Sequence, residues 1–319
     1  MALECARNEK SLRRLAIALL FGCYMEGLAC LYQYITGFDF IHGYPLLDGR
    51  LTGTMATYWV GNYLLLASVP AWALCRYVRH NLGKGFGLFC LGAIAWPIIF
   101  GIYFAAARAA YVSGLVVLSF VFFWKERVPR KKILIFLAIV VLVLMAGLCF
   151  FGKNRFALQT ILTDARLILW TFSIEVFKTS IWTGVGAWQY SSVLPTLEIA
   201  QHWSEGWITT SHPHNAYLQV LCETGILGFL MCFGVFFFLF YKAIQGVRAG
   251  LLSEKSKPRT NSFWHLTFYF TLGCLAFFVH FLFGHDFFRP WYQALFMIFL
   301  GILLGAVVSN KALVTKSEM

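Results

Sequence analysis

The chain of 319 residues is 60% hydrophobic and only 13% charged, with a mean hydropathy of +0.70. Soluble domains are roughly 45–50% apolar and about 25% charged, so this composition excludes a soluble enzyme and predicts a protein embedded in a bilayer. The net charge of +12 needs no nucleic-acid partner, because the cytoplasmic loops of membrane proteins collect Lys and Arg.

Long apolar runs predict an all-α transmembrane bundle, because lipid offers backbone polar groups no partner outside a helix. One span needs about 20 apolar residues. Runs of this kind occur at Leu15–Thr36, Thr54–Tyr77, Gly85–Tyr103, Ala105–Trp124, Ile133–Phe151, Ala216–Tyr241, Phe263–Phe283 and Trp291–Ser309. The break between the third and fourth runs rests on Arg108 alone. We therefore expect one polytopic membrane domain over residues 1–319, with about eight spans.

The distribution of Lys and Arg among the loops predicts the orientation, since positive charge collects on the cytoplasmic side. With these spans, 19 of the 26 Lys and Arg residues lie on the side of the two termini. The opposite side holds Arg50, Arg108, Lys153, Arg155, Arg166, Lys178 and Arg289. Both termini are therefore predicted to be cytoplasmic, and the second side faces outward, into the periplasm of a Gram-negative cell.

Residues 152–214 form a large predicted periplasmic loop. A structureless loop of this length is uncommon, so the segment should contain helices of its own. Within Asp164–Lys178, apolar residues recur at helical spacing, which is typical of a helix lying on a membrane surface; they are Leu167, Leu169, Trp170, Ile174 and Phe177. Gly184, Gly186 and Pro195 interrupt the pattern after it.

Three of the outward arginines are candidate ligands for an anion. Arg108 lies between two apolar runs, where a charge is either functional or turned toward the membrane surface. Arg166 opens the predicted surface helix and Arg50 precedes a span, so a solvated helix charge and an interfacial loop charge are the alternatives. Because guanidinium binds phosphate oxygens in pairs and stays charged, three arginines on one side suit a phosphate-bearing ligand.

The densest group of candidate residues lies at the start of the sixth span. His214 is a candidate general base, and Glu223, inside an apolar run, must face the bundle interior or a polar cavity. His212 and His214 could together bind a metal, but no carboxylate stands beside them, so no metal or other cofactor is expected. The alternative is a pair of loop histidines followed by a capping Asn215.

This segment also carries a resemblance. The run from His212 through Glu223 to Gly228 has the form His-Pro-His-Asn-x-Tyr-Leu-Gln-x-x-x-Glu-x-Gly-x-x-Gly. It resembles the signature of the O-antigen ligase and O-antigen polymerase superfamily. Arg166-x-x-x-Trp170, followed by Trp182-Thr-Gly-Val-Gly186, resembles the Arg-containing stretch that precedes a Gly-x-Gly in that family.

Two further stretches extend the resemblance over most of the chain, from Arg50 to Gly228. Arg50-Leu-Thr-Gly53 is similar to an Arg-x-x-Gly stretch of the family. Arg108 stands where the family has a Ser-Arg pair at the start of a span, although Ala107 replaces the serine. Members of the family usually have several spans before the counterpart of Leu15–Thr36, so this chain looks short at its N-terminus.

The resemblance implies a metal-independent, inverting glycosyltransferase with a GT-C-like fold in the bacterial inner membrane. The donor is a glycan on undecaprenyl diphosphate, and the acceptor is lipid A–core for a ligase or a lipid-linked glycan for a polymerase. Arg108 and Arg166, with Arg50, would bind the diphosphate, and His214 would take the acceptor proton. Glu223 would orient His214 or brace an arginine, and His212 and Asn215 would be auxiliary. We expect a ligase; a polymerase, and a non-catalytic membrane protein or transporter, are the alternatives.

Overall fold

The computed structural model of the protein is helical, in agreement with the predicted all-α fold. It describes residues 8–55, 57, 59–124, 131, 134–135, 138, 165–198, 212–254, 263–284 and 289–317. Within these ranges the extended pairing is limited to two isolated bridges, Phe38 with Pro45 and Leu47 with Arg50. The chain divides into two compact units, each described by itself below.

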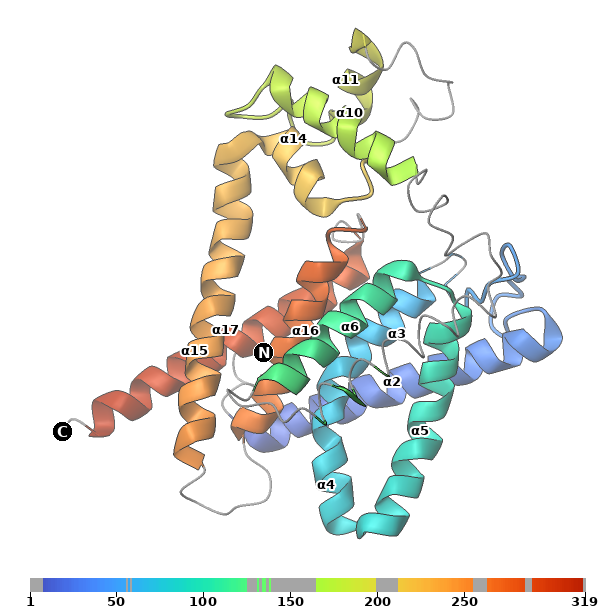
Figure 1. Cartoon of the computed structure of the whole chain (residues 1–319), viewed down its shortest axis with the longest axis vertical. Helices are drawn as coiled ribbons and strands as arrows, with labels where there is room; N and C mark the ends of the chain where they lie inside the picture. Colours follow the sequence, from blue (N-terminus) through green and yellow to red (C-terminus); the bar gives the residue numbers. More distant parts are fainter. Residues whose placement is uncertain are drawn as a thin grey trace. The chain divides into compact units, whose positions relative to one another are not determined.

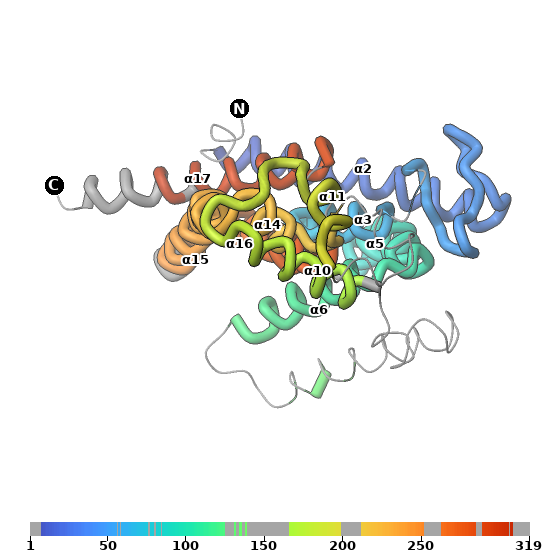
Figure 2. The backbone as a smooth tube through the Cα atoms, turned by 90° about the horizontal axis from the view of Figure 1, so that it is seen from above, coloured from blue at the N-terminus to red at the C-terminus, as the bar shows by residue number. Residues whose placement is uncertain are grey.

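The first unit comprises residues 1–114, 236–277 and 291–319. Its elements are α2 (Glu9–Thr36), α3 (Val60–Ser68), the 3-10 helix η1 (Val69–Ala73), α4 (Leu74–Asn81), α5 (Lys84–Phe104), the start of α6 (Arg108–Phe123), most of α15 (Val235–Glu254), most of α16 (Phe263–His280) and most of α17 (Pro290–Ser317). Helices α2, α3 and α5 lie side by side (Figures 1 and 2).

Small residues bring these three helices together. Gly27 of α2 faces the backbone of α5, where an added Cβ would come within 2.7 Å of the Pro97 carbonyl carbon. Gly101 of α5 faces Cys30 of α2 and Leu64 of α3. Close backbone approach of this kind is how helices pack in a membrane, where no hydrophobic force drives them together.

The second unit comprises residues 115–235 and 278–290. Its described elements include α10 (Ala165–Thr179), α11 (Tyr190–Val193), the 3-10 helix η2 (Leu194–Thr196), α14 (Ala216–Phe229) and the π-helical turn η3 (Leu230–Gly234). The helix predicted at Asp164–Lys178 is therefore present as α10. Its apolar core joins α10 to α11, η2 and α14.

Two predicted spans differ from single straight helices. Thr54–Tyr77 is divided into α3, η1 and α4, because Pro70 has no N–H to continue an α-helical ladder. Ala216–Tyr241 is interrupted at Gly225, whose φ of 66° and ψ of −172° are not helical. The chain then continues through η3 into α15. Both predicted spans are therefore helical but contain breaks that hydropathy did not indicate.

The other predicted spans have helical counterparts wherever the structure describes them. In the described residues, four helices are long and apolar enough to cross a membrane, namely Glu9–Thr36, Gly85–Phe104, Ala216–Leu251 and Phe263–His280. Arg108–Phe123 and Pro290–Gly305 are shorter apolar helices. The predicted span Ile133–Phe151 lies outside the described residues apart from isolated positions. The protein is thus a multi-pass membrane protein.

Candidate functional site

Arg50 reaches the end of α5. Its side chain is buried, and its Nε and Nη2 donate to the carbonyl oxygens of Ala105 at 2.9 Å and Ala106 at 3.2 Å. The next residue, Leu51, donates its backbone N–H to the Phe104 carbonyl at 3.3 Å. The last carbonyls of a helix lack intrahelical partners and carry partial negative charge, so a buried guanidinium is well matched to them. The Nε and Nη2 groups of Arg50 therefore bind backbone carbonyls of the protein itself.

Arg108 is the first residue of α6 and is half-buried. The turn before it bends sharply, since Ala106 has a φ of 49°. On both sides of Arg108 the chain is buried, and Ala107 and Ala110 pack against Leu65 of α3. The sequence argument for a break before Arg108 is therefore confirmed, and the base of the Arg108 side chain is held in a fixed place.

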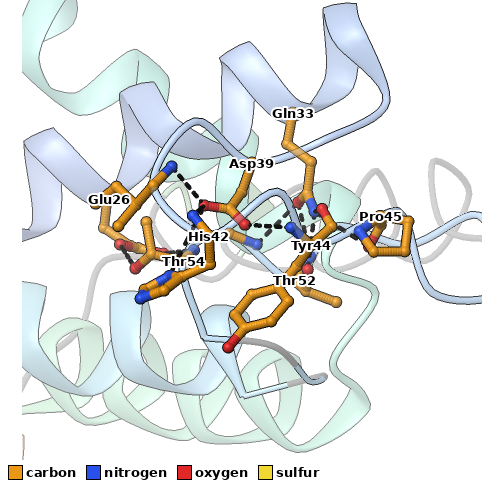
Figure 3. A network of polar contacts seen from close by, with 10 residues as sticks. Glu26, Gln33, Asp39, His42, Tyr44, Pro45, Thr52 and Thr54 are labelled. Atoms are coloured by element: carbon orange, nitrogen blue, oxygen red, sulfur yellow. Dashed lines mark hydrogen bonds and ion pairs between the residues drawn. The ribbon is translucent and has the colours of Figure 1, made fainter.

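A network of polar contacts holds the loop that carries Arg50 (Figure 3). Gln33 of α2 is fully buried, and its Nε2 donates to Thr52 Oγ1 at 2.8 Å and to the Tyr44 carbonyl at 3.0 Å. Its Oε1 accepts the backbone N–H groups of Thr52 and Gly53, both at 2.9 Å. The buried Gln33 amide thus satisfies backbone groups of Tyr44, Thr52 and Gly53. These hydrogen bonds fix the loop to α2.

Two carboxylates complete this network. Glu26, on the same face of α2 as Gln33, accepts the Thr54 backbone N–H at 2.8 Å and the Thr54 hydroxyl at 2.7 Å. Asp39 accepts backbone N–H groups of Ile41, His42 and Tyr44 at 2.6–2.9 Å. Burial alone would raise the pKa of Asp39, but these hydrogen bonds and nearby His42 outweigh it and hold that pKa below its ordinary value.

In the second unit, α10 packs on α14 through one buried face (Figure 1). Leu169, Phe172 and Val176 of α10 contact Tyr190 and Cys222 in this core. The predicted apolar residues fall on two faces of α10, because Leu169 lies in this core whereas Leu167 is 42% and Ile174 46% exposed. Their spacing of seven places them together on a different face from the buried residues.

Polar groups inside this core are paired. Ser173 donates to the Leu169 carbonyl at 2.7 Å and lies 3.1 Å from the Tyr190 hydroxyl. Burial raises the pKa of Tyr190 to about 12, so its hydroxyl stays protonated at neutral pH. Cys222 Sγ lies 3.0 Å from the Ser173 carbonyl. Arg166 lies about one turn before this packed region and is half-buried.

The Gly-x-Gly stretch and the Glu-x-Gly stretch of the resemblance are paired in space. Val185 N–H donates to the Cys222 carbonyl at 2.9 Å, and Gly186 N–H to the Glu223 carbonyl at 3.0 Å. In the other direction, Ile226 N–H donates to the Ile181 carbonyl at 2.9 Å. This reciprocal backbone pairing satisfies groups that the break at Gly225 would otherwise leave open.

Glu223 is buried beside the paired segments. Its Oε1 accepts from Gln219 Nε2 at 3.3 Å, and its carboxylate also accepts the backbone N–H of Trp188. Glu223 follows His214 by nine positions, or about 13 Å of helix rise, which is too far for direct contact along α14. Among the described residues Glu223 makes no ion pair and no bond to His214. The structure thus gives no support to either predicted role of Glu223.

His214 precedes α14 in a left-handed backbone conformation, with a φ of 52°. Asn215 is the N-cap, and its Oδ1 accepts the N–H groups of Tyr217 at 3.0 Å and Leu218 at 3.1 Å. The capping interpretation of Asn215 is confirmed. The His212 and His214 rings lie 4.5 Å apart, edge to face. Non-glycine residues adopt this conformation rarely, and such positions gather at functional sites.

The start of α14 is anchored on the end of α16. Ala216 N–H donates to the carbonyls of Phe281 at 2.9 Å and Gly284 at 3.1 Å, and the Tyr217 hydroxyl donates to the Phe278 carbonyl at 2.8 Å. These bonds join two segments far apart in sequence. They fix the backbone immediately after His214.

The site residues divide between the two units. Arg50 and Arg108 lie in the first unit, whereas Arg166, His212, His214, Asn215 and Glu223 lie in the second. Sequence reasoning missed Gln33, Gln219 and Trp188. The sequence held a signal for Gln33, because it stands seven residues from Glu26 within the largely apolar run Leu15–Thr36. No cluster of three or more His, Cys, Asp or Glu suited to a metal occurs among the residues that the structure describes.

Comparison with known proteins finds a family similarity in the middle of the chain. Residues 93–233 match the family model described as O-antigen ligase, a range rather shorter than half of the chain. That range includes every predicted site residue except Arg50. No curated protein matches the chain. Residues 93–233 are thus similar to the O-antigen ligase family, whose members are glycosyltransferase-like enzymes with lipid-linked glycan substrates.

Proposed function

We propose that the protein transfers a glycan from undecaprenyl diphosphate to a lipid A–core acceptor at the periplasmic face of the bacterial inner membrane. The observation that carries the proposal is the placement of His214. It lies at the start of α14 inside the matched family segment, with a rare backbone conformation. Its position is fixed by the Asn215 cap and by the bonds from α14 to residues 278–284.

In this proposal His214 acts as the general base. Its imidazole takes the proton from the acceptor hydroxyl while that oxygen attacks the anomeric carbon of the donor sugar. The bond from the anomeric carbon to the diphosphate oxygen breaks in the same displacement, and the electron pair leaves with undecaprenyl diphosphate. Attack opposite the leaving group inverts the anomeric centre.

Arg108 and Arg166 are assigned to the diphosphate. The leaving group gains negative charge as the glycosidic bond breaks, and fixed positive groups at that point stabilise the transition state. Guanidinium groups can do this without a metal ion, because each presents two parallel N–H donors to phosphate oxygens. Both arginines begin helices, α6 for Arg108 and the first turn of α10 for Arg166. The positive ends of these helix dipoles add to the attraction.

Glu223 is assigned a positioning role. Its bonds to Gln219 and Trp188 link α14 to the loop after Gly186. A buried carboxylate with these partners holds the paired segments together without contact to substrate.

Loss of the gene, followed by gel analysis of lipopolysaccharide, tests the reaction class. A ligase predicts lipopolysaccharide without O-antigen, together with accumulated lipid-linked polymer. Lipopolysaccharide carrying a single repeat unit would instead identify a polymerase. An unchanged lipopolysaccharide profile and normal lipid-linked intermediates would contradict both and favour the transporter or non-catalytic alternative.

A further inference from the structure

The resemblance suggested Arg50 as a third ligand of the diphosphate, but its surroundings point to another task. Arg50 is buried, and its Nε and Nη2 donate to Ala105 and Ala106. These two carbonyls belong to the turn that ends two residues before Arg108. Arg50 also lies outside the segment that matches the family model.

The turn needs such a restraint. Ala106 has a φ of 49°, a conformation that an alanine rarely adopts and that persists when its surroundings hold it. The carbonyls of Ala105 and Ala106 follow the last turn of α5, where helix carbonyls have no partner of their own. Arg50 supplies both partners with one planar group, so it selects this turn over alternatives that leave the carbonyls buried and unpaired.

The remaining contacts make this turn the base of Arg108. Ala107 and Ala110 pack against Leu65 of α3, and the Tyr111 hydroxyl donates to the Tyr103 carbonyl, tying the first turn of α6 to the end of α5. Gly61 of α3 faces the side chains of Ala105 and Ala107 with no room for a Cβ. The turn before α6 is therefore held both by α3 and by Arg50.

The loop that carries Arg50 is itself held in place by α2. Three residues beyond it, Gly53 lies against the Glu26 carboxylate, and its N–H donates to Gln33 Oε1. Thr52 is bonded to both ends of the Gln33 amide. The chain of contacts runs from α2 through Gln33 to the loop, then through Arg50 to the turn and to Arg108.

We propose that Arg50 is a positioning residue for Arg108: it holds the turn at Ala105 and Ala106 so that the Arg108 guanidinium is aimed at the donor diphosphate. This inference rests on the proposed function, which assigns Arg108 to that diphosphate. A small displacement of a charge-stabilising group costs much of its effect, on the order of 10²-fold for about 1 Å.

The test measures transfer kinetics of purified full-length protein with lipid-linked donor and lipid A–core acceptor. Arg50→Ala is expected to lower kcat/KM for the donor by roughly 10- to 100-fold and to raise the donor KM, while the acceptor KM is unchanged. Partial misfolding would lower kcat and leave both KM values as they are, so the pattern separates positioning from lost protein. Arg79→Ala removes an exposed arginine of the same unit and should leave all three values unchanged.

Arg50→Lys covers the case in which Arg50→Ala does not accumulate in the membrane. A lysine keeps the charge but has no planar fork for two successive carbonyls, so it should give the same pattern of changes to a smaller extent. An Arg50→Lys protein with wild-type donor KM and kcat would overturn the proposal.

A double-mutant comparison identifies the residue through which Arg50 acts. In an Arg108→Lys background the loss caused by Arg50→Ala should shrink several-fold, because the group it aims is already impaired. An equal loss in both backgrounds would overturn positioning and identify Arg50 as an independent ligand. Arg108→Ala reports separately on the proposed function. Full activity there refutes the diphosphate role of Arg108, whereas an inactive Arg108→Ala beside a wild-type-like Arg50→Ala refutes only the positioning role.

Discussion

Gly184 and Gly225 lie on the two segments of one backbone pairing, and at each glycine the backbone of the other segment fills the place of a Cβ. A Cβ on Gly184 would overlap the peptide between Glu223 and Thr224, and a Cβ on Gly225 would overlap the backbone of Trp182. Both residues also have positive φ, of 71° and 66°. The glycines of the two stretches that carry the family resemblance therefore serve a single contact.

Gly184→Ala and Gly225→Ala should each disrupt the second unit. The positive-φ conformation alone costs an alanine about 1–3 kcal/mol, and the clash with backbone atoms adds to it. We expect a lower melting temperature in detergent and faster proteolysis between residues 165 and 235. Gly92→Ala is the matched control, since it lies in helix α5 with open space around it. A wild-type melting temperature for either variant would contradict the tight pairing.

His214→Asn should remove the general base while keeping the backbone, because asparagine tolerates a positive φ better than alanine does. Turnover is expected to fall by roughly 10²- to 10⁴-fold, with donor binding retained. His212→Asn should be much milder, and EDTA should have no effect. In vitro transfer by the two variants, with and without chelator, makes the comparison. An inactive His212→Asn beside an active His214→Asn would reassign the base, and chelator inhibition reversed by a divalent cation would indicate a metal at the two histidines.

Arg108→Ala and Arg166→Ala should each abolish transfer while the protein remains in the membrane. Lysine at either position should restore part of the activity, because the charge is kept and the paired N–H donors are lost. Transfer rates and immunoblots of membrane fractions measure the two effects. Full activity of one alanine variant would remove that arginine from the proposed diphosphate site.

Asp39→Asn should weaken the loop between α2 and α3 at neutral pH. The folded-state pKa of Asp39 is lowered, so its stabilising contribution is complete above the unfolded value of about 4 and is lost as pH falls through the folded value. Melting temperatures from pH 7 to pH 3 should therefore show a gap between wild type and Asp39→Asn that closes at acid pH. The gap at pH 7 should correspond to about 1–3 kcal/mol. A gap that is independent of pH would contradict a charged Asp39.

Reporter fusions test the predicted topology. The 19-to-7 division of Lys and Arg predicts a cytoplasmic site after Lys255 and a periplasmic site after Lys178. Alkaline phosphatase fused after Lys178 should be active and the fusion after Lys255 inactive. The reverse activities would require the opposite orientation and would place His214 on the cytoplasmic side.

Much of the fold could be predicted because its signals are local. An apolar run of about 20 residues has to form a helix in lipid, whatever the rest of the chain does. This reasoning placed α2, α5 and α16 to within a few residues, apart from six additional helical residues at the start of α2. Asn215 could be identified as a possible cap because an N-cap bonds to N–H groups two and three residues away.

Other features depended on partners distant in the chain. The break at Gly225 is stabilised by carbonyls of Ile181 and Trp182, more than forty residues earlier, so hydropathy read Ala216–Tyr241 as one helix. The exposed position of Leu167 depends on which face of α10 meets α14. Spacing along α10 alone does not decide this, since apolar residues occur on both faces.

Run length and residue type are enough to predict that the protein is helical and lies in a membrane, and that its middle segment resembles a glycosyltransferase family. The contacts of Arg50, in contrast, follow from the tertiary structure. Its partners Ala105 and Ala106 lie 55 and 56 residues away. A guanidinium can donate either to a phosphate or to helix carbonyls, so its role is set by which acceptors the fold brings within about 3 Å.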